Sequence, residues 1–135
     1  MDAAQALDYI RENTNAVLAT ARADGTPQMS PVTLAVVDET VVMSTRETAY
    51  KTKNLRRDPR SWLCVFPRNF FGDWVQIECQ AEIISGPDAL EPLVDYYRTL
   101  RGDHPDWDEY RQAMVDDQRC LVKFHILRAG PDRSG

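Results

Sequence analysis

The sequence predicts a mainly β protein with additional helices, in which six strands form a small antiparallel barrel. Asp24-Gly25 and Asp38-Glu39 are turn sequences that would join the first three strands as hairpins. The order of strands and helices after the first helix, β-β-β-α-β-β-α-α-β, does not alternate as βαβ, which argues against a doubly wound parallel sheet. It favours a small, mostly antiparallel barrel with helices outside.

The strands are expected where short apolar or alternating runs occur, and these runs lie at residues 16–20, 27–37, 41–45, 61–66, 74–85 and 119–127. Pro31 lies inside the second run, and a proline cannot donate a ladder hydrogen bond. That strand therefore needs an edge position or a bulge. The last strand is followed by a polar segment, residues 128–135, which we expect to be a frayed tail.

Four helices are expected around these strands, at residues 2–12, 50–57, 86–101 and 106–118. The first has Ala3, Ala6, Leu7 and Ile10 at helical spacing. The second ends at Asp58 because the residue before a proline is driven out of the α region. We expect all of these elements to form one domain, residues 1–135.

Composition excludes several classes of function. The chain has 135 residues, a net charge of −5 and a pI near 5.0, whereas nucleic-acid binders usually present a basic face. Three widely spaced cysteines give no disulfide framework, and neither histidine has a partner at a zinc-ligand spacing. No apolar run is long enough to span a membrane, and the N-terminus lacks the basic start of a signal peptide. We expect a cytoplasmic protein without a metal site.

One segment reverses the overall charge. Between Ser44 and Arg60 there are six basic and two acidic residues, a local charge of +4 in a chain of net −5. Ser44, Thr45 and Lys51 surround the expected start of the second helix, where unpaired N–H groups and the helix dipole favour an anion. The segment therefore predicts a phosphate cradle, although a solvated basic helix is the alternative interpretation. No nucleophilic triad, metal cluster or P-loop competes with it.

The order of these motifs resembles a known family. Pro-Gln-x-Ser-x-Val (27–32), Met-Ser-Thr (43–45) and Lys-Thr-Lys-Asn-Leu (51–55) are similar to the pyridoxamine 5′-phosphate oxidase-like proteins, which have the FMN-binding split-barrel fold. The stretches 54–60 and 106–114 resemble the branch of that family that uses the deazaflavin coenzyme F420. The resemblance covers roughly residues 7–127. It departs at Ala49, where related F420 proteins tend to have an arginine that Arg46 would have to replace.

The resemblance implies a set of cofactor-binding residues. Ser44, Thr45 and Lys51 would hold the phosphate, with Asn54 one helical turn further on. Ring contacts would come from Gln28, Ser30, Pro31 and Val32, while Met43 and Arg46 would flank the chain between ring and phosphate. Trp74 would be supplied by the second subunit of a homodimer.

The implied activity is hydride transfer from a reduced deazaflavin to a small organic acceptor, with no general acid assigned. FMN is the alternative cofactor. A non-catalytic carrier of a flavin or deazaflavin is the alternative function, because fold alone does not settle function.

Overall fold

The sheet contains seven strands rather than the expected six, because Leu34 interrupts the second expected strand. A computed structural model, which describes residues 1–131, places β2 (Pro27–Thr33) beside β1 (Asn15–Ala21), and β3 (Ala35–Val37) beside β4 (Thr40–Arg46). Leu34 is fully buried, and its N–H donates to the carbonyl of Thr14 at 2.7 Å. This contact fixes the bend where the chain leaves one strand for the other.

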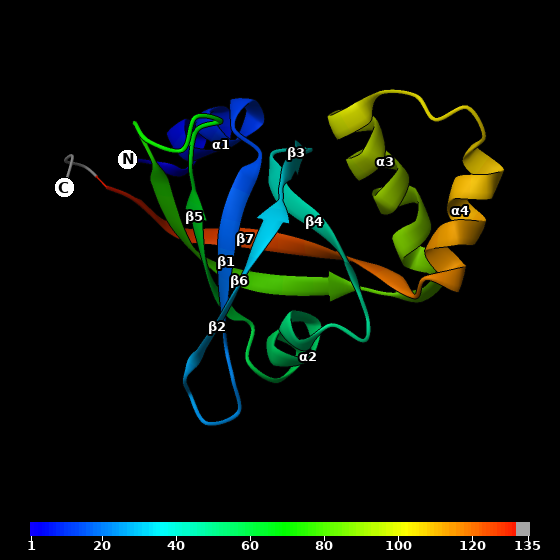
Figure 1. Ribbon diagram of the computed structural model, residues 1–135, viewed down its shortest axis with the longest axis horizontal. Coiled ribbons are helices and arrows are strands. Elements are labelled where there is room, and N and C mark those ends of the chain that lie inside the picture. Colours follow the sequence, from blue (N-terminus) through cyan, green and yellow to red (C-terminus); the bar gives the residue numbers. More distant parts are fainter. Residues whose placement is uncertain (132–135) are drawn as a thin grey trace.

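The break at Leu34 determines the shape of the molecule. The strand order is β2-β1-β5-β6-β7-β4-β3, so the two pieces of the expected strand form opposite edges of one antiparallel sheet. The sheet curls until these edges are joined by one residue (Figure 1). The barrel is therefore closed by the chain and split between its edge strands, as the split-barrel prediction requires. The expected hairpin to the third strand holds for β3 and β4 only.

The long strands form the centre of the sheet. β5 (Arg60–Val65) pairs with β6 (Val75–Ile84), which pairs in turn with β7 (Arg119–Gly130). The expected frayed tail is wrong at its start, because Arg128 to Gly130 continue β7 and pair with Glu78, Ile77 and Gln76. Their backbone groups find partners in β6, which keeps them in the sheet. Residues 132–135 of that expected tail lie outside the described residues.

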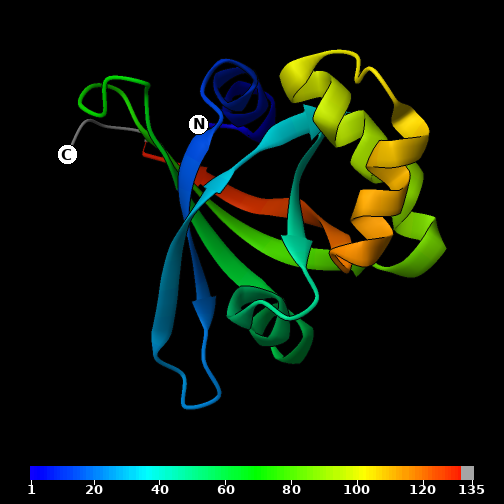
Figure 2. The same cartoon turned by 45° about the vertical axis from the view of Figure 1, so that its right-hand side comes forward.

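Two helices close the ends of the barrel. α1 (Ala3–Glu12) lies across one end and α2 (Tyr50–Arg57) across the other (Figures 1 and 2). Ile10 of α1 is fully buried and Leu55 of α2 is 2% exposed, and both belong to the main core. Asp2 starts α1 with a reciprocal capping box. The bounds of α2 match the sequence prediction.

A second core lies outside the barrel. The 3₁₀ helix η1 (Gly86–Ala89) leads into α3 (Leu90–Arg101), which packs beside α4 (Trp107–Asp116). Leu93, Val94 and Tyr110 of these helices pack with Leu121 of β7. Asp106 caps α4 by accepting from the N–H of Glu109. Within residues 1–131, none of the helices is both long and apolar enough to span a membrane.

Candidate functional site

A groove of about 460 Å³ separates α2 from the turn that joins β1 and β2. The hairpin and α2 lie side by side at the end of the barrel that α2 covers (Figure 2). Three of the residues that line the groove are cations, two carry carboxamides, and none is acidic. They are Arg22, Ala23, Gln28, Tyr50, Lys53, Asn54 and Arg57. Such a lining favours an anionic ligand.

A polar network fixes the wall of this groove. Asn54 is 6% exposed, and its Nδ2 donates to Oγ1 of Thr20 at 3.0 Å. The Thr20 hydroxyl in turn donates weakly to Oε1 of Gln28 at 3.4 Å. Arg57 Nη2 donates to Oδ1 of Asn54 at 3.0 Å and to the carbonyl of Ala21 at 2.8 Å. The network joins α2 to β1 and β2, so the groove has a preformed shape.

None of the three groove cations forms a close ion pair among residues 1–131. Arg22 and Arg57 act only from a distance, by helping to lower the pKa of the Asp24 and Asp58 carboxyls. Arg22 donates from Nη1 to the carbonyl of Pro27 at 2.9 Å, and Lys53 lies over the ring of Tyr50 at 5.8 Å. Arg57 bonds only to the neutral acceptors described above. The charge of these cations is therefore compensated only in part within the described chain.

The other arginines of the basic segment are already neutralised. Hydrogen bonds from Arg60 hold the pKa of the Asp58 carboxyl below its usual range, and hydrogen bonds from Arg119 and Arg46 do the same for Asp117. Positive charge is thus concentrated on one side of α2. The three ion pairs are Arg46–Asp117 (3.0 Å), Arg56–Glu47 (2.6 Å) and Arg60–Asp58 (2.8 Å).

β2 presents the second part of the site. Its side chains alternate, with Gln28, Ser30 and Val32 half-buried and Met29 and Pro31 exposed. The strand pattern therefore separates Pro31 from the other three expected ring-contacting residues. The hydroxyl of Ser30 is buried and has no hydrogen-bond partner in the described part of the chain. A buried hydroxyl without a partner costs free energy, so a ligand that supplies one is favoured here.

The backbone of β2 adds further donors and acceptors. β2 is an edge of the sheet and pairs with β1 alone. Half of the peptide groups of an edge strand lack a strand partner. A flat polar ligand can bond to such groups along the split of the barrel.

The end of β4 contributes less than expected. Met43 is 1% exposed and belongs to the core, so packing accounts for its side chain. Thr45 is 2% exposed, and its hydroxyl lies 3.2 Å from that of Thr52, which donates to the carbonyl of Arg46. Ser44 is half-buried. The side chain of Arg46 forms an ion pair with Asp117 at 3.0 Å, and its expected replacement of the missing arginine at Ala49 stays a prediction.

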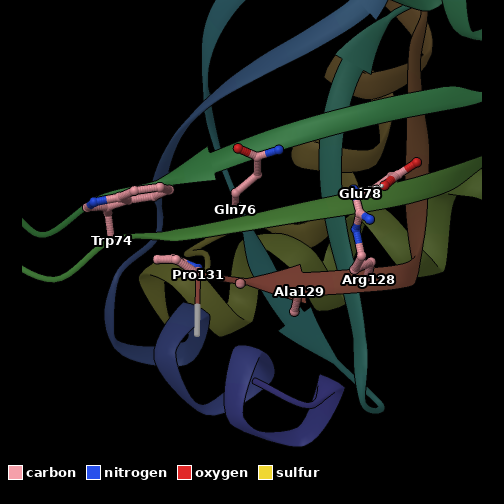
Figure 3. A pocket seen from close by; sticks show the side chains of 7 residues that line it. Trp74, Gln76, Glu78, Arg128, Ala129 and Pro131 are labelled. Carbon is pink, nitrogen blue, oxygen red and sulfur yellow. Dashed lines mark ion pairs between the residues drawn. The ribbon is translucent and has the colours of Figure 1, made fainter. Parts of the chain in front are cut away.

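Lys51 and Trp74 lie outside the groove. Lys51 is half-buried on α2 and makes no ion pair with the described residues, but it points about 100° around the helix from Tyr50. Trp74 lines a different hollow of about 260 Å³ near the ends of β6 and β7. Figure 3 shows Trp74 and Pro131 on one side of that hollow and the Glu78–Arg128 ion pair on the other. One chain does not bring Trp74 to Lys51.

Arg22, Tyr50, Lys53 and Arg57 line the groove but were not among the expected site residues. The sequence could have identified Lys53 and Arg57, because they follow Tyr50 at helical spacing and so lie on the same face of α2. Arg22 carried no such signal. Only the folded sheet places its hairpin beside α2.

Comparison with known proteins identifies the family. The model of the pyridoxamine 5′-phosphate oxidase family matches residues 3–130. The chain belongs to the pyridoxamine 5′-phosphate oxidase family. Proteins of this family bind flavin or deazaflavin cofactors.

Solved structures with the same fold have different described roles. A conserved hypothetical protein of Mycobacterium tuberculosis is 25% identical, with a TM-score of 0.78 over 100% of this chain and 92% of that one. An F420 reductase is 17% identical, with a TM-score of 0.70 over 91% and 94%. A heme binding protein of Mycobacterium smegmatis is 20% identical, with a TM-score of 0.67 over 98% and 56%. The last two likenesses show the fold alone.

The residues of this member fit a flavin-type cofactor. Such a cofactor has a flat heterocycle with polar edges and a chain that ends in an anion. Ser30 and the free edge of β2 match the first part, because both lack hydrogen-bond partners in the described chain. The unpaired cations around α2 match the second.

Proposed function

We propose that this protein is an F420-dependent oxidoreductase that transfers a hydride to a small organic acceptor. The observation that carries this proposal is the groove lined by Arg22, Lys53 and Arg57, which form no close ion pair in the described chain. FMN ends at a single phosphate, which needs one anion site. F420 continues beyond its phosphate into a tail of glutamates, which suits several free cations along a groove.

Each part of the site has a role in this proposal. Lys51 and Ser44 bind the phosphate at the start of α2, while Gln28, Ser30 and Val32 contact the ring. Asn54 positions Arg57 and the hairpin and does not need to contact the cofactor itself. When bound, the reduced deazaflavin supplies the hydride, and the protein supplies binding, orientation and exclusion of water. We assign no general acid.

We further propose that the protein acts as a homodimer. On the outer face of the sheet, Met29, Ala19 and Trp62 lie in one row across three strands, and Met29 is 64% exposed. Phe70 and Phe71 are 62% and 80% exposed on the loop before Trp74. Exposed apolar rows of this kind usually mark a contact surface. A second copy would cover the row and bring Trp74 to a site that one chain leaves open.

We place the reaction in the cytoplasm. The three cysteines, Cys64, Cys79 and Cys120, are all free thiols. Burial raises the pKa of Cys79 to about 12, which leaves it an unreactive core residue. Unpaired cysteines are typical of proteins in a reducing compartment.

The test of the cofactor is a competition between F420 and FMN for the purified protein. We expect F420 to bind more tightly at low salt, and its advantage to shrink as salt rises, because exposed charges are screened over about 8 Å at physiological ionic strength. Equal affinity at low salt, or purification with stoichiometric FMN, would assign the protein to FMN. Turnover of an acceptor panel with reduced F420 separates an enzyme from a carrier, because a carrier binds without turnover.

A further inference from the structure

We infer that Tyr96 of α3 is a positioning residue of the cofactor site, where it holds β2 and β4 at the separation that a bound cofactor needs. The inference rests on the proposed function, because that function places the two ends of one cofactor on these two strands. Its basis is the position of the Tyr96 hydroxyl at the split of the barrel, where it bonds to the end of β2.

The sheet itself does not fix the separation of β2 and β4. β2 pairs with β1 alone, and β3 pairs with β4 only from Thr40 to Val42. Where β3 ends, β4 becomes the edge of the sheet, and its stretch from Met43 to Arg46 pairs with β7 alone. Strand hydrogen bonds therefore do not join β2 to this part of β4, and another contact has to hold them in place.

Tyr96 supplies that contact. α3 lies against β3 and β4 (Figure 1), and the half-buried ring of Tyr96 packs against both the main core and the second core. The Tyr96 hydroxyl donates to the carbonyl of Thr33, the last residue of β2, at 2.8 Å. Burial raises the pKa of Tyr96, and a hydrogen bond from the backbone of Ser44 opposes that rise. One hydroxyl thus contacts both strands across the split.

The proposed site makes the separation of these strands important. Ser30 and Val32 of β2 contact the ring, whereas Ser44 of β4 contacts the phosphate. Thr33 follows Ser30 by three residues, about 10 Å along the strand, so the link lies close to the ring contacts. One ligand can bind to both strands at once only if their separation matches its length. A link that fixes this separation before binding lowers the entropic cost of ordering the site.

The second core offers a matched control. The hydroxyl of Tyr110, a residue only 8% exposed, donates to the carbonyl of Leu93 at 2.9 Å. Tyr96→Phe and Tyr110→Phe each remove one bond from a phenol hydroxyl to a backbone carbonyl and keep the ring. Only the Tyr96 bond involves a strand at the split. Because Tyr110 is the more deeply buried, its variant should be the less stable of the two.

The experiment compares both variants with the wild type in Tm, in the Kd of F420 and of FMN, and in the exchange rate of the Ser44 amide proton by NMR. We expect Tyr110→Phe to lower the Tm by about 3 °C and Tyr96→Phe by no more than that. The Kd of the cofactor should nevertheless rise about two- to twelvefold in Tyr96→Phe and less than about twofold in Tyr110→Phe. In the ligand-free protein, the Ser44 amide should exchange faster only in Tyr96→Phe, because only that variant removes its acceptor.

Three results would overturn the inference. These are an equal rise in Kd in the two variants, a wild-type Kd in Tyr96→Phe, and an unchanged exchange rate of the Ser44 amide in Tyr96→Phe. The cofactor assignment fails separately. If F420 has no advantage over FMN but Tyr96→Phe alone weakens FMN binding, the role of Tyr96 stands and the proposed function is wrong. If F420 is preferred but Tyr96→Phe binds it like the wild type, the reverse holds. A wild-type protein that binds neither cofactor would contradict both.

Discussion

Replacing Ser30 with alanine is expected to stabilise the ligand-free protein while weakening cofactor binding. The Ser30 hydroxyl is buried and has no partner among residues 1–131. Leaving a buried hydroxyl unsatisfied costs about 1–3 kcal/mol. Alanine removes that cost but loses some packing, so we expect a net gain of about 1 kcal/mol in the free energy of unfolding. At this chain length that gain corresponds to a rise of about 3 °C in Tm.

Binding should change in the opposite direction. If the cofactor ring supplies the missing partner, Ser30→Ala removes a hydrogen bond that exists only in the complex. Such a bond contributes about 0.5–1.5 kcal/mol, so the Kd should rise about two- to twelvefold. Urea denaturation of the ligand-free protein and a cofactor titration measure the two effects independently.

Ser61 provides the control for this pair of measurements. It is fully buried, like the Ser30 hydroxyl, but its Oγ donates to the carbonyl of Cys79 at 3.3 Å. Ser61→Ala should therefore lower the free energy of unfolding by about 0.5–1.5 kcal/mol, the usual contribution of one hydrogen bond. If Ser30→Ala destabilises the protein as much as Ser61→Ala, or leaves the Kd unchanged, the assignment of Ser30 to the ring site is refuted.

Three further predictions test other parts of the molecule. Lys51→Ala should weaken cofactor binding by about 1.5–3 kcal/mol. The free energy of unfolding should change little, because Lys51 makes no ion pair in the described chain. A titration that gives wild-type affinity would show that Lys51 does not bind the phosphate. Burial alone would raise the pKa of Glu47, but hydrogen bonds from Ser85 and Arg56 bring it below its usual range. Glu47 therefore adds stability above pH 4.5 that is lost as the pH falls further, and urea titrations of Glu47→Gln should show a shallower acid loss than the wild type. Met29→Glu places a charge in the outer apolar row and should release monomers in light scattering, whereas a wild-type species of only 15.4 kDa would exclude the dimer.

Local signals in the sequence predicted most of the elements. The bounds of α2 follow from its basic helical run and from Pro59, and both signals act on neighbouring residues. The break at Leu34 could not be predicted in this way. Its neighbours are strand-forming on both sides, and only the burial of Leu34 against the rest of the barrel makes a bend favourable there. The continuation of β7 to Gly130 likewise depends on β6, a partner distant in sequence.

The candidate site was predicted less completely than the fold. Alternation along β2 could have separated Pro31 from Ser30 in advance, because successive side chains point to opposite faces. The burial of Thr45 and Met43 could not be anticipated from their motif. Arg22 is the clearest omission, since nothing in the sequence around it indicates that its turn lies beside α2.

The charge of the basic segment shows why its sequence count cannot locate a binding site. The net charge from Ser44 to Arg60 is +4, but this number does not tell which cations the two acidic residues pair with. In the folded chain Glu47 and Asp58 neutralise Arg56 and Arg60, and Asp117, from outside the segment, neutralises Arg46. Among residues 1–131, Lys51, Lys53 and Arg57 form no close ion pair, and Arg22 joins the last two from the β1–β2 hairpin. Charges that are paired in the fold contribute little at a distance, so the ligand encounters only the unpaired set. The preference for a polyanionic cofactor therefore depends on which ion pairs form. Lys53→Gln and Arg56→Gln each remove one positive charge, but we expect Lys53→Gln to weaken cofactor binding more, because Arg56 is already paired with Glu47.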